Sequence, residues 1–219
     1  MCKEINVIKN TRKFCLIVFF FTVFNSILAN VDYESWSSLE FGKKLPFSFE
    51  LDFEQALRLK DNLSSFKQTF TETSVSYNMF NGMKFFIPFR YAVFKDKIKK
   101  RISFGAAYKH NLNKISFRYR IKLQKTYLDD KIFNPLIRNK FTLGSKINKK
   151  LRPYVSQEFS HFVQDGQVDY DEYRLSVGVR INLGKKRETK IFYTQKIEGL
   201  SKKNQDKANV FGVSYAFEW

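Results

Sequence analysis

The sequence predicts an all-β fold: a single closed, antiparallel, up-and-down transmembrane β-barrel of about 10–12 strands with short turns on one rim. Apolar and polar side chains alternate along most of the chain, as they do when successive residues of a strand point to opposite faces. No window of comparable length has helical periodicity. Short and long connections alternate between these runs, which is typical of a barrel with turns on one rim and loops on the other.

Residues 1–29 are predicted to be a secretory signal peptide, so that residues 30–219 form the mature barrel. Basic side chains precede the short apolar segment Phe14–Val23, and Ala29 offers a small residue for cleavage. The alternative is an uncleaved anchor, but this segment is shorter than the ~20 residues that a spanning helix needs. Cys2 and Cys15 both lie in the removed part, so we expect no disulfide, thiol nucleophile or thiolate metal site in the mature chain.

The clearest strand signal lies between Phe47 and Lys60, where Phe and Leu side chains alternate with charged ones. Ile115–Gln124 and Tyr173–Leu183 repeat the pattern. Weaker runs occur at Trp36–Leu45, Phe66–Phe80, Met83–Lys95, Arg101–His110, Ile137–Ile147, Leu151–Val163, Arg187–Ile197 and Asn209–Trp219. These runs predict eleven strands.

The connections set the direction of each strand. Asn81-Gly82 predicts a tight hairpin turn, because both residue types tolerate a positive φ. Other short connections are expected at 43–46, 111–113, 148–150 and 184–186, and longer ones at 61–65, 94–100, 127–136, 164–169 and 198–207. The C-terminus then lies on the turn side and the first strand begins on the loop side, which an even-numbered antiparallel barrel does not allow. Either residues 31–37 form a twelfth strand, or residues 36–45 lie outside a ten-stranded wall.

Alternation alone does not say which face meets solvent. Three observations favour an apolar face toward lipid: strands of at least the ~9–11 residues that cross a bilayer, the signal peptide, and the C-terminal strand. That strand ends with Tyr215, Phe217 and Trp219 in alternation and resembles the assembly signal of bacterial outer-membrane proteins. The predicted location is therefore the outer membrane of a Gram-negative bacterium, with insertion by the barrel-assembly machinery. A secreted soluble β-sandwich or lipocalin-like binding protein is the alternative.

The chain is strongly basic, with 39 Lys and Arg against 21 Asp and Glu and a formal charge of +18. Such a charge is common in nucleic-acid-binding proteins, but export argues against that partner. Anionic lipid headgroups or the phosphates of lipopolysaccharide are the expected counterpart.

Several segments resemble a known family. Trp36–Leu45, the strand containing Arg118 and Arg120, and Arg152–Phe159 look like the domain of unknown function 2490, a bacterial outer-membrane barrel family seen largely in Bacteroidetes-type bacteria. The resemblance covers nearly all of residues 33–219, with lysines at Lys122 and Lys140 where arginine is expected to be common. It implies an outer-membrane barrel and supplies no established chemistry.

The predicted inward faces carry a charge pattern. Glu50, Asp52 and Glu54, with Arg58, form an acidic wall early in the chain, beside Glu40. Later strands supply a basic wall: Arg90, Arg118, Arg120, Lys122, Arg138, Lys140, Arg152, Arg174 and Arg180, with Glu158 among them. One interpretation is a lumen filled by ion pairs, since pairing offsets the burial of either charge alone. The other is a narrow channel or binding site for a small anion such as a carboxylate, a phosphate or an acidic sugar.

The sequence predicts neither an enzyme nor a cofactor. His110 and His161 both fall on the apolar face, and Ser160 points away from its neighbour His161, so these two side chains cannot form a nucleophile–base pair. The stepwise spacing of Glu50, Asp52 and Glu54, about 7 Å, is compatible with glycoside chemistry or a hard-metal site, although no partner strand is identified. An outer-membrane enzyme acting on lipid or envelope polysaccharide remains the alternative function.

Overall fold

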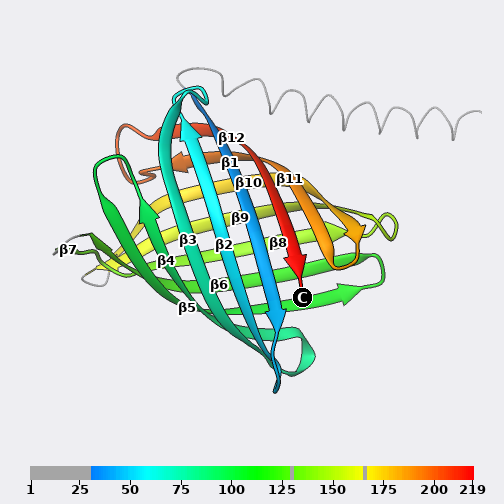
Figure 1. Cartoon of the computed structure of the whole chain (residues 1–219). Coiled ribbons are helices and arrows are strands. Elements are labelled where there is room, and N and C mark those ends of the chain that lie inside the picture. Colours follow the sequence, from blue (N-terminus) through cyan, green and yellow to red (C-terminus); the bar gives the residue numbers. More distant parts are fainter. Residues whose placement is uncertain (1–30, 129–130, 165–166) are drawn as a thin grey trace, which may run out of the picture. The chain divides into compact units, whose positions relative to one another are not determined.

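The protein is a closed β-barrel in the computed structural model, which describes residues 31–128, 131–164 and 167–219 (Figure 1). The predicted signal peptide, residues 1–29, lies outside the described residues. Eleven strands form the ring: β1 (Asp32–Lys44), β2 (Phe49–Lys60), β3 (Ser65–Asn78), β4 (Met83–Val93), β5 (Ile98–Leu112), β6 (Ile115–Leu128), β8 (Leu136–Ser145), β9 (Leu151–Gln164), β10 (Gln167–Gly184), β11 (Arg187–Glu198) and β12 (Asp206–Glu218). The two-residue β7 (Lys131–Ile132) pairs with the end of β6.

All eleven predicted runs are strands of this ring, so the predicted all-β single barrel is confirmed. The difference in length between short and long connections is smaller than predicted, because several strands extend beyond the predicted runs into the expected loops. β9 ends at Gln164 and β10 begins at Gln167, where the sequence predicts a six-residue loop. We call the rim formed by residues 45–48, 79–82, 113–114, 146–150, 185–186 and the C-terminus the turn rim, and the opposite one the loop rim.

The ring closes through one parallel pair, between β1 and β12. Their register runs from Asp32 opposite Ala208 to Gly42 opposite Glu218, and every other neighbouring pair in the ring is antiparallel. An up-and-down ring with an odd number of strands must contain one such pair. Neither predicted alternative occurs, because residues 32–44 form one strand inside the wall. Figure 1 shows the β1 and β12 arrows side by side and pointing the same way.

Both ends of β1 are fastened by hydrogen bonds outside the ladder. At the loop rim the Asp32 carboxylate accepts from the backbone amides of Asp61 (3.2 Å) and Asn62 (3.0 Å) in the β2–β3 turn. At the turn rim the Trp219 amide donates to the Gly42 carbonyl at 2.9 Å. Parallel pairing is slightly weaker per residue than antiparallel pairing, and these contacts anchor the strand that closes the ring.

The β3–β4 connection has the predicted positive φ angles at Asn81 and Gly82, but its backbone forms a 3-10 turn. Phe80–Gly82 form one turn of 3-10 helix, with Asn81 at φ 55° and Gly82 at φ 80°. A Cβ at Gly82 would lie 2.2 Å from the Lys109 carbonyl oxygen of β5. Glycine is therefore required here both for its backbone conformation and for this close approach.

The barrel carries its apolar side chains outside and its polar ones inside. Phe49 is 41% exposed and Phe117 39%, whereas Glu34, Ser160 and Thr194 are each 2% exposed or less. A soluble sandwich sealed by these apolar side chains is thus not the observed fold. Among the described residues, no helix has the length and apolar character needed to cross a membrane.

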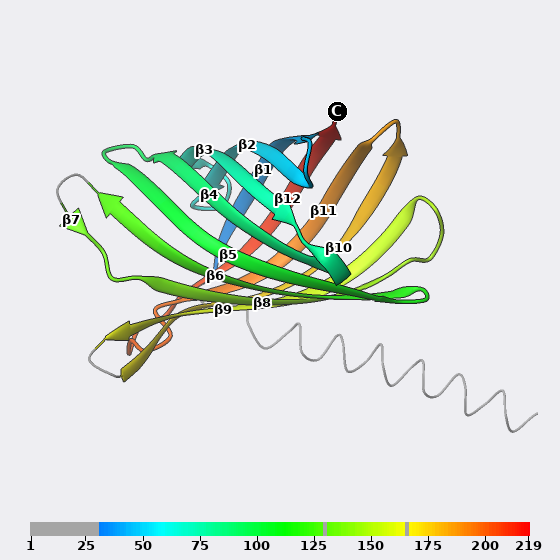
Figure 2. The ribbon, with the colours of Figure 1, turned by 90° about the horizontal axis from the view of Figure 1, so that it is seen from below.

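The acidic and basic segments of the chain lie on opposite sides of the ring. Figure 2 shows β1, β2 and β3 on one side and β6, β8 and β9 on the other. This arrangement follows from the strand order, in which β4 and β5 separate the two groups on one path and β10 to β12 on the other.

Candidate functional site

A cavity of about 890 Å³ occupies the turn-rim half of the barrel interior. Gly42, Gly184, Lys185 and Glu218 line it at the turn rim, so the cavity reaches that end of the barrel. The side chains nearest the loop rim, including Glu34 and Lys196, do not line it. The lumen therefore consists of a cavity half and a packed half.

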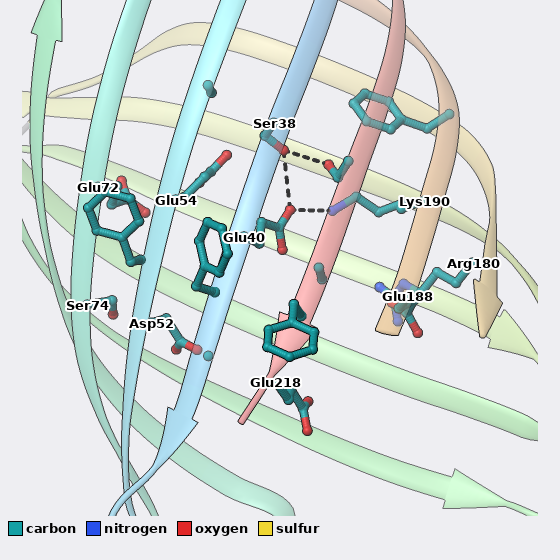
Figure 3. Close-up of a pocket in the computed structure, with 18 of the residues that line it drawn as sticks. Ser38, Glu40, Asp52, Glu54, Glu72, Ser74, Arg180, Glu188, Lys190 and Glu218 are labelled. Carbon is teal, nitrogen blue, oxygen red and sulfur yellow. Dashed lines mark hydrogen bonds and ion pairs between the residues drawn. The ribbon is translucent and has the colours of Figure 1, made fainter. Parts of the chain in front are cut away.

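One side of the cavity is an acidic wall on β1, β2 and β3. Its carboxylates are Glu40, Glu50, Asp52, Glu54 and Glu72, and all but Glu50 are labelled in Figure 3. Lys84 of β4 pairs with Glu50 at 2.7 Å, and Arg90 of the same strand pairs with Glu72 at 2.6 Å. Lys190 of β11 lies 3.3 Å from Glu40, which also accepts from Ser38. Glu40, Glu50 and Glu72 thus each have a cation partner from β4 or β11.

The opposite side is a basic wall on β6, β8, β9 and β10. Seven cations of these strands line the cavity: Arg118, Arg120, Lys122, Lys140, Arg152, Arg174 and Arg180. No carboxylate of the described residues lies within ion-pair distance of Arg118, Lys122, Arg152 or Arg180. Lys122 is only 8% exposed. The basic wall thus keeps positive charge that the described protein groups do not neutralise.

A network around two buried carboxylates joins the packed half to the basic wall: neither carboxylate lines the cavity, but Arg120, Lys140 and Arg174 do. Glu158 of β9 receives Arg120 at 2.9 Å, Lys140 at 3.8 Å and a bond from Arg138. Glu172 of β10 accepts from Arg138 at 3.2 Å and from Arg174 at 2.9 Å. The side chains of both glutamates are less than one-tenth exposed. Several charge-assisted hydrogen bonds per carboxylate offset the cost of removing these charges from water.

A second buried carboxylate centre holds the closing strand. Glu34 of β1 is 2% exposed and lies 2.7 Å from Lys67 of β3 and 2.6 Å from Lys196 of β11. It also accepts from the Trp36 indole nitrogen at 2.8 Å. Glu34 thereby joins three strands across both edges of β1.

A stack of arginines and aromatic rings lies at the end of the cavity away from the turn rim, where Trp36, Arg58, Phe70 and Arg174 line it. Arg58 of β2 lies 3.9 Å from the centroid of the Trp36 ring and 5.0 Å from that of Phe70. Arg90 covers Phe70 at 3.7 Å, and Arg174 of β10 lies 5.0 Å from the Trp36 ring. We call this group the cation–π floor; it crosses the lumen, because β10 and β1 are not neighbours in the ring.

The structure brings only some of the predicted lumen residues together. Arg120, Arg138 and Glu158 form one network, as the ion-pair interpretation predicts. Glu50, Asp52 and Glu54 share one wall, but none pairs with a cation of the basic wall among the described residues. The ion pairs instead join neighbours on the same side of the ring, and among the described residues part of the basic wall has no carboxylate partner. Arg58 joins the floor, and Arg118 and Arg180 face the cavity.

Three important charged residues were missed: Glu34, Glu172 and Lys196. Glu34 lies two residues before Trp36, and Glu172 two residues before Arg174, so each continues an inward face that the sequence did reveal. The predicted strands began too late to include these two glutamates, whereas Lys196 lies within the predicted run Arg187–Ile197 and was not assigned to the lumen. Extension of each strand by one inward position would have found both glutamates.

The C-terminal aromatic residues lie on the outer face of β12. The Phe217 and Trp219 rings meet edge to face with centroids 6.0 Å apart, and Trp219 is 67% exposed. Tyr215 pairs with Leu39 in the ladder between β12 and β1. The role of these residues in assembly stays a prediction.

A smaller groove of about 630 Å³ lies on the outer face near the loop rim, lined by Asn139, Phe159, His161, Tyr170, Leu200 and Ser201. The Ser201 hydroxyl donates to the Tyr170 carbonyl at 3.0 Å, and the His161 ring contacts the Tyr170 ring. Ser160 is 1% exposed and faces the interior, so it lies on the opposite face from His161. Within the described part of the chain, no group of three His, Cys, Asp or Glu side chains could hold a metal ion.

The comparison with known proteins agrees with this architecture. The family model described as "Protein of unknown function (DUF2490)" matches residues 33–207. No curated protein matches the sequence. The matched region includes both the first ten ring strands and the charged lumen residues from Glu34 to Lys196. Because the match covers most of the 219 residues, the chain belongs to the DUF2490 family.

Proposed function

We propose that this protein is a bacterial outer-membrane barrel that binds small anions in the cavity at its turn rim. The observation that carries the proposal is the cluster of cavity-lining cations, Arg118, Lys122, Arg152 and Arg180, without a carboxylate partner among the described residues. The partners are outer-membrane lipid and lipopolysaccharide on the outer face, and a small anion in the lumen.

The outer surface supports a membrane location. Its exposed apolar side chains come from every strand of the ring, and large continuous apolar surfaces mark contact with lipid or with another protein. The ring strands have 10 to 18 residues, enough for the ~9–11 that cross a bilayer at a tilt. The polar lumen and apolar exterior are the reverse of a soluble core and are typical of outer-membrane barrels.

The cavity is suited to anions by its chemistry as well as its charge. Guanidinium groups bind carboxylates, phosphates and sulfonates through paired hydrogen bonds. Lys185 and Lys186 lie in the β10–β11 turn and line the mouth, where they raise the local concentration of anions. The cation–π floor limits passage toward the loop rim, so binding is favoured over free conduction.

The test is anion binding by the protein purified from membranes in detergent. Calorimetric titration with acetate and with inorganic phosphate is expected to show binding that weakens as salt is raised. Arg118→Glu should abolish it, whereas Lys203→Glu, an exposed loop-rim control, should not. Recordings in planar bilayers would show whether any current is anion-selective. Absence of both binding and anion-selective current would leave a purely structural barrel.

A second candidate, an outer-membrane lipid hydrolase, is favoured by one observation: His161, Ser201 and Asn139 line the same outer groove. A serine nucleophile needs a base within hydrogen-bonding reach, and here the Ser201 hydroxyl donates to a backbone carbonyl. Under the anion-binding proposal, His161→Ala and Ser201→Ala leave both binding and envelope lipids unchanged. Loss of a lipid modification in either variant would favour the hydrolase.

A further inference from the structure

The two walls of the cavity carry opposite charge and are separated by open space. The acidic wall lies on β1 to β3 (Figure 3) and the basic wall on β6 to β10. Figure 2 shows β1 to β3 on the opposite side of the ring from β6, β8 and β9. Among the described residues, no ion pair joins a carboxylate of the acidic wall to a cation of the basic wall. The field across the cavity therefore has a fixed direction.

Two carboxylates of the acidic wall have only distant cation partners. Asp52 lies 3.8 Å from Lys84, and Glu54 lies 3.9 Å from Arg90. These distances exceed those of hydrogen bonds, and each cation has a closer contact with another glutamate. The Asp52 side chain is 43% exposed and that of Glu54 29%, both within the cavity lining. Both carboxylates can accept hydrogen bonds from a ligand.

The basic wall provides an independent indication of a ligand. Lys122 is more than nine-tenths buried and lines the cavity, yet it has no hydrogen bond or ion pair to any described residue. The Lys122 ammonium group has no described protein partner, and a bound anionic group would offset the cost of removing this side chain from water. Arg118 and Arg180 line the same wall and also lack carboxylate partners among the described residues.

We propose that the ligand is a small zwitterion, with its anionic group on the basic wall and its ammonium group on Asp52 and Glu54. This inference rests on the proposed anion-binding function and specifies the ligand class for the same cavity. A simple anion satisfies only one wall, whereas a zwitterion aligned with the field satisfies both. The volume of about 890 Å³ falls in the usual range for small-molecule sites and admits an amino acid or an aminosulfonate.

Taurine and isethionate provide a matched test, because they share a sulfonate and differ only in an ammonium group replaced by a hydroxyl. Titration of the purified full chain in detergent is expected to show taurine binding about fivefold more tightly, the gain from one partly screened ion pair. In the double variant Asp52→Asn, Glu54→Gln, this preference should disappear while isethionate binding remains. Glu198→Gln, at a half-exposed carboxylate outside the cavity, is the control and should keep the preference.

The outcomes separate this inference from the function on which it rests. Equal or weaker binding of taurine relative to isethionate would overturn the zwitterion and leave the anion site intact. Binding of neither compound would overturn the anion site itself. A preference that persists in the double variant would show that the ammonium group does not bind Asp52 and Glu54. Heat-dependent gel mobility confirms that each variant keeps a folded barrel.

Discussion

The packed half and the cavity half of the lumen are built from the same strands, but their charged side chains differ in how many ion-pair partners they have. In the packed half, Glu34 and Glu158 each contact at least two cations and are almost completely buried. In the cavity half, Arg118 and Arg180 have no carboxylate partner among the described residues and lie beside open space. We infer that the buried ion pairs stabilise the barrel, while the cations without a carboxylate partner near the turn rim serve the proposed anion site.

The largest effect is expected at Glu158, where one carboxylate balances three cations. Glu158→Gln should lower the free energy of unfolding by about 4 kcal/mol, because the cations of β6 and β8 lose their buried partner. Urea titration of the purified protein measures this change. Glu218→Gln is the matched control: Glu218 is half exposed and contacts Lys44 only at 3.9 Å, so its effect should be near zero. Similar losses of unfolding free energy in both variants would show that the buried ion pairs stabilise the barrel no more than the exposed ones do.

A somewhat smaller effect is expected at Glu34, which fastens the closing strand. Glu34→Gln should cost about 3 kcal/mol, because Lys196 is 3% exposed and would lose its charge partner. The glutamine can still accept from the Trp36 indole, so part of the contact survives. Limited proteolysis should then cleave within β1 faster than within β6. If β1 stays protected, the parallel pairing with β12 closes the barrel without help from Glu34.

The floor lies between the two halves and has two opposing contributions to stability. Arg58→Ala removes cation–π contacts with Trp36 and Phe70, but it also removes a partly buried guanidinium whose buried Nε has no hydrogen-bond acceptor. These contributions should nearly cancel, so that the free energy of unfolding changes by less than about 1 kcal/mol. The space left in the floor by removal of the Arg58 side chain should nevertheless raise the ionic current in planar bilayers.

The control for the floor is Lys125→Ala. Lys125 of β6 also makes a cation–π contact, with its Nζ 5.9 Å from the centroid of the Tyr127 ring, but it is exposed and does not line the cavity. Its removal should leave the current unchanged. An equal rise in both variants would mean that the floor does not limit passage.

The fold and the location of the charges could be predicted because both depend on local alternation. Phe49 and Glu50 face opposite sides in any strand, and this holds whichever strands are neighbours. The parallel closure could not be predicted in this way, since it depends on which strands meet after the ring has formed. Ion pairs depend on register between strands: Glu158 faces Lys140 and Arg174 only because of how β8, β9 and β10 align. The cavity, likewise, depends on side-chain packing across the lumen.

The smallest effect on stability is expected at the unpaired cations, where the effect on binding should be clear. Arg118→Gln should change the free energy of unfolding by less than about 0.5 kcal/mol, since no buried carboxylate loses a partner. Anion affinity should fall about fivefold, the contribution of one charged contact in a solvated cavity, and its dependence on salt should weaken. Calorimetry at two salt concentrations, paired with urea unfolding, measures both quantities. A loss of stability comparable to that of Glu158→Gln would place Arg118 in the structural network, and the cavity half would then have no separate role.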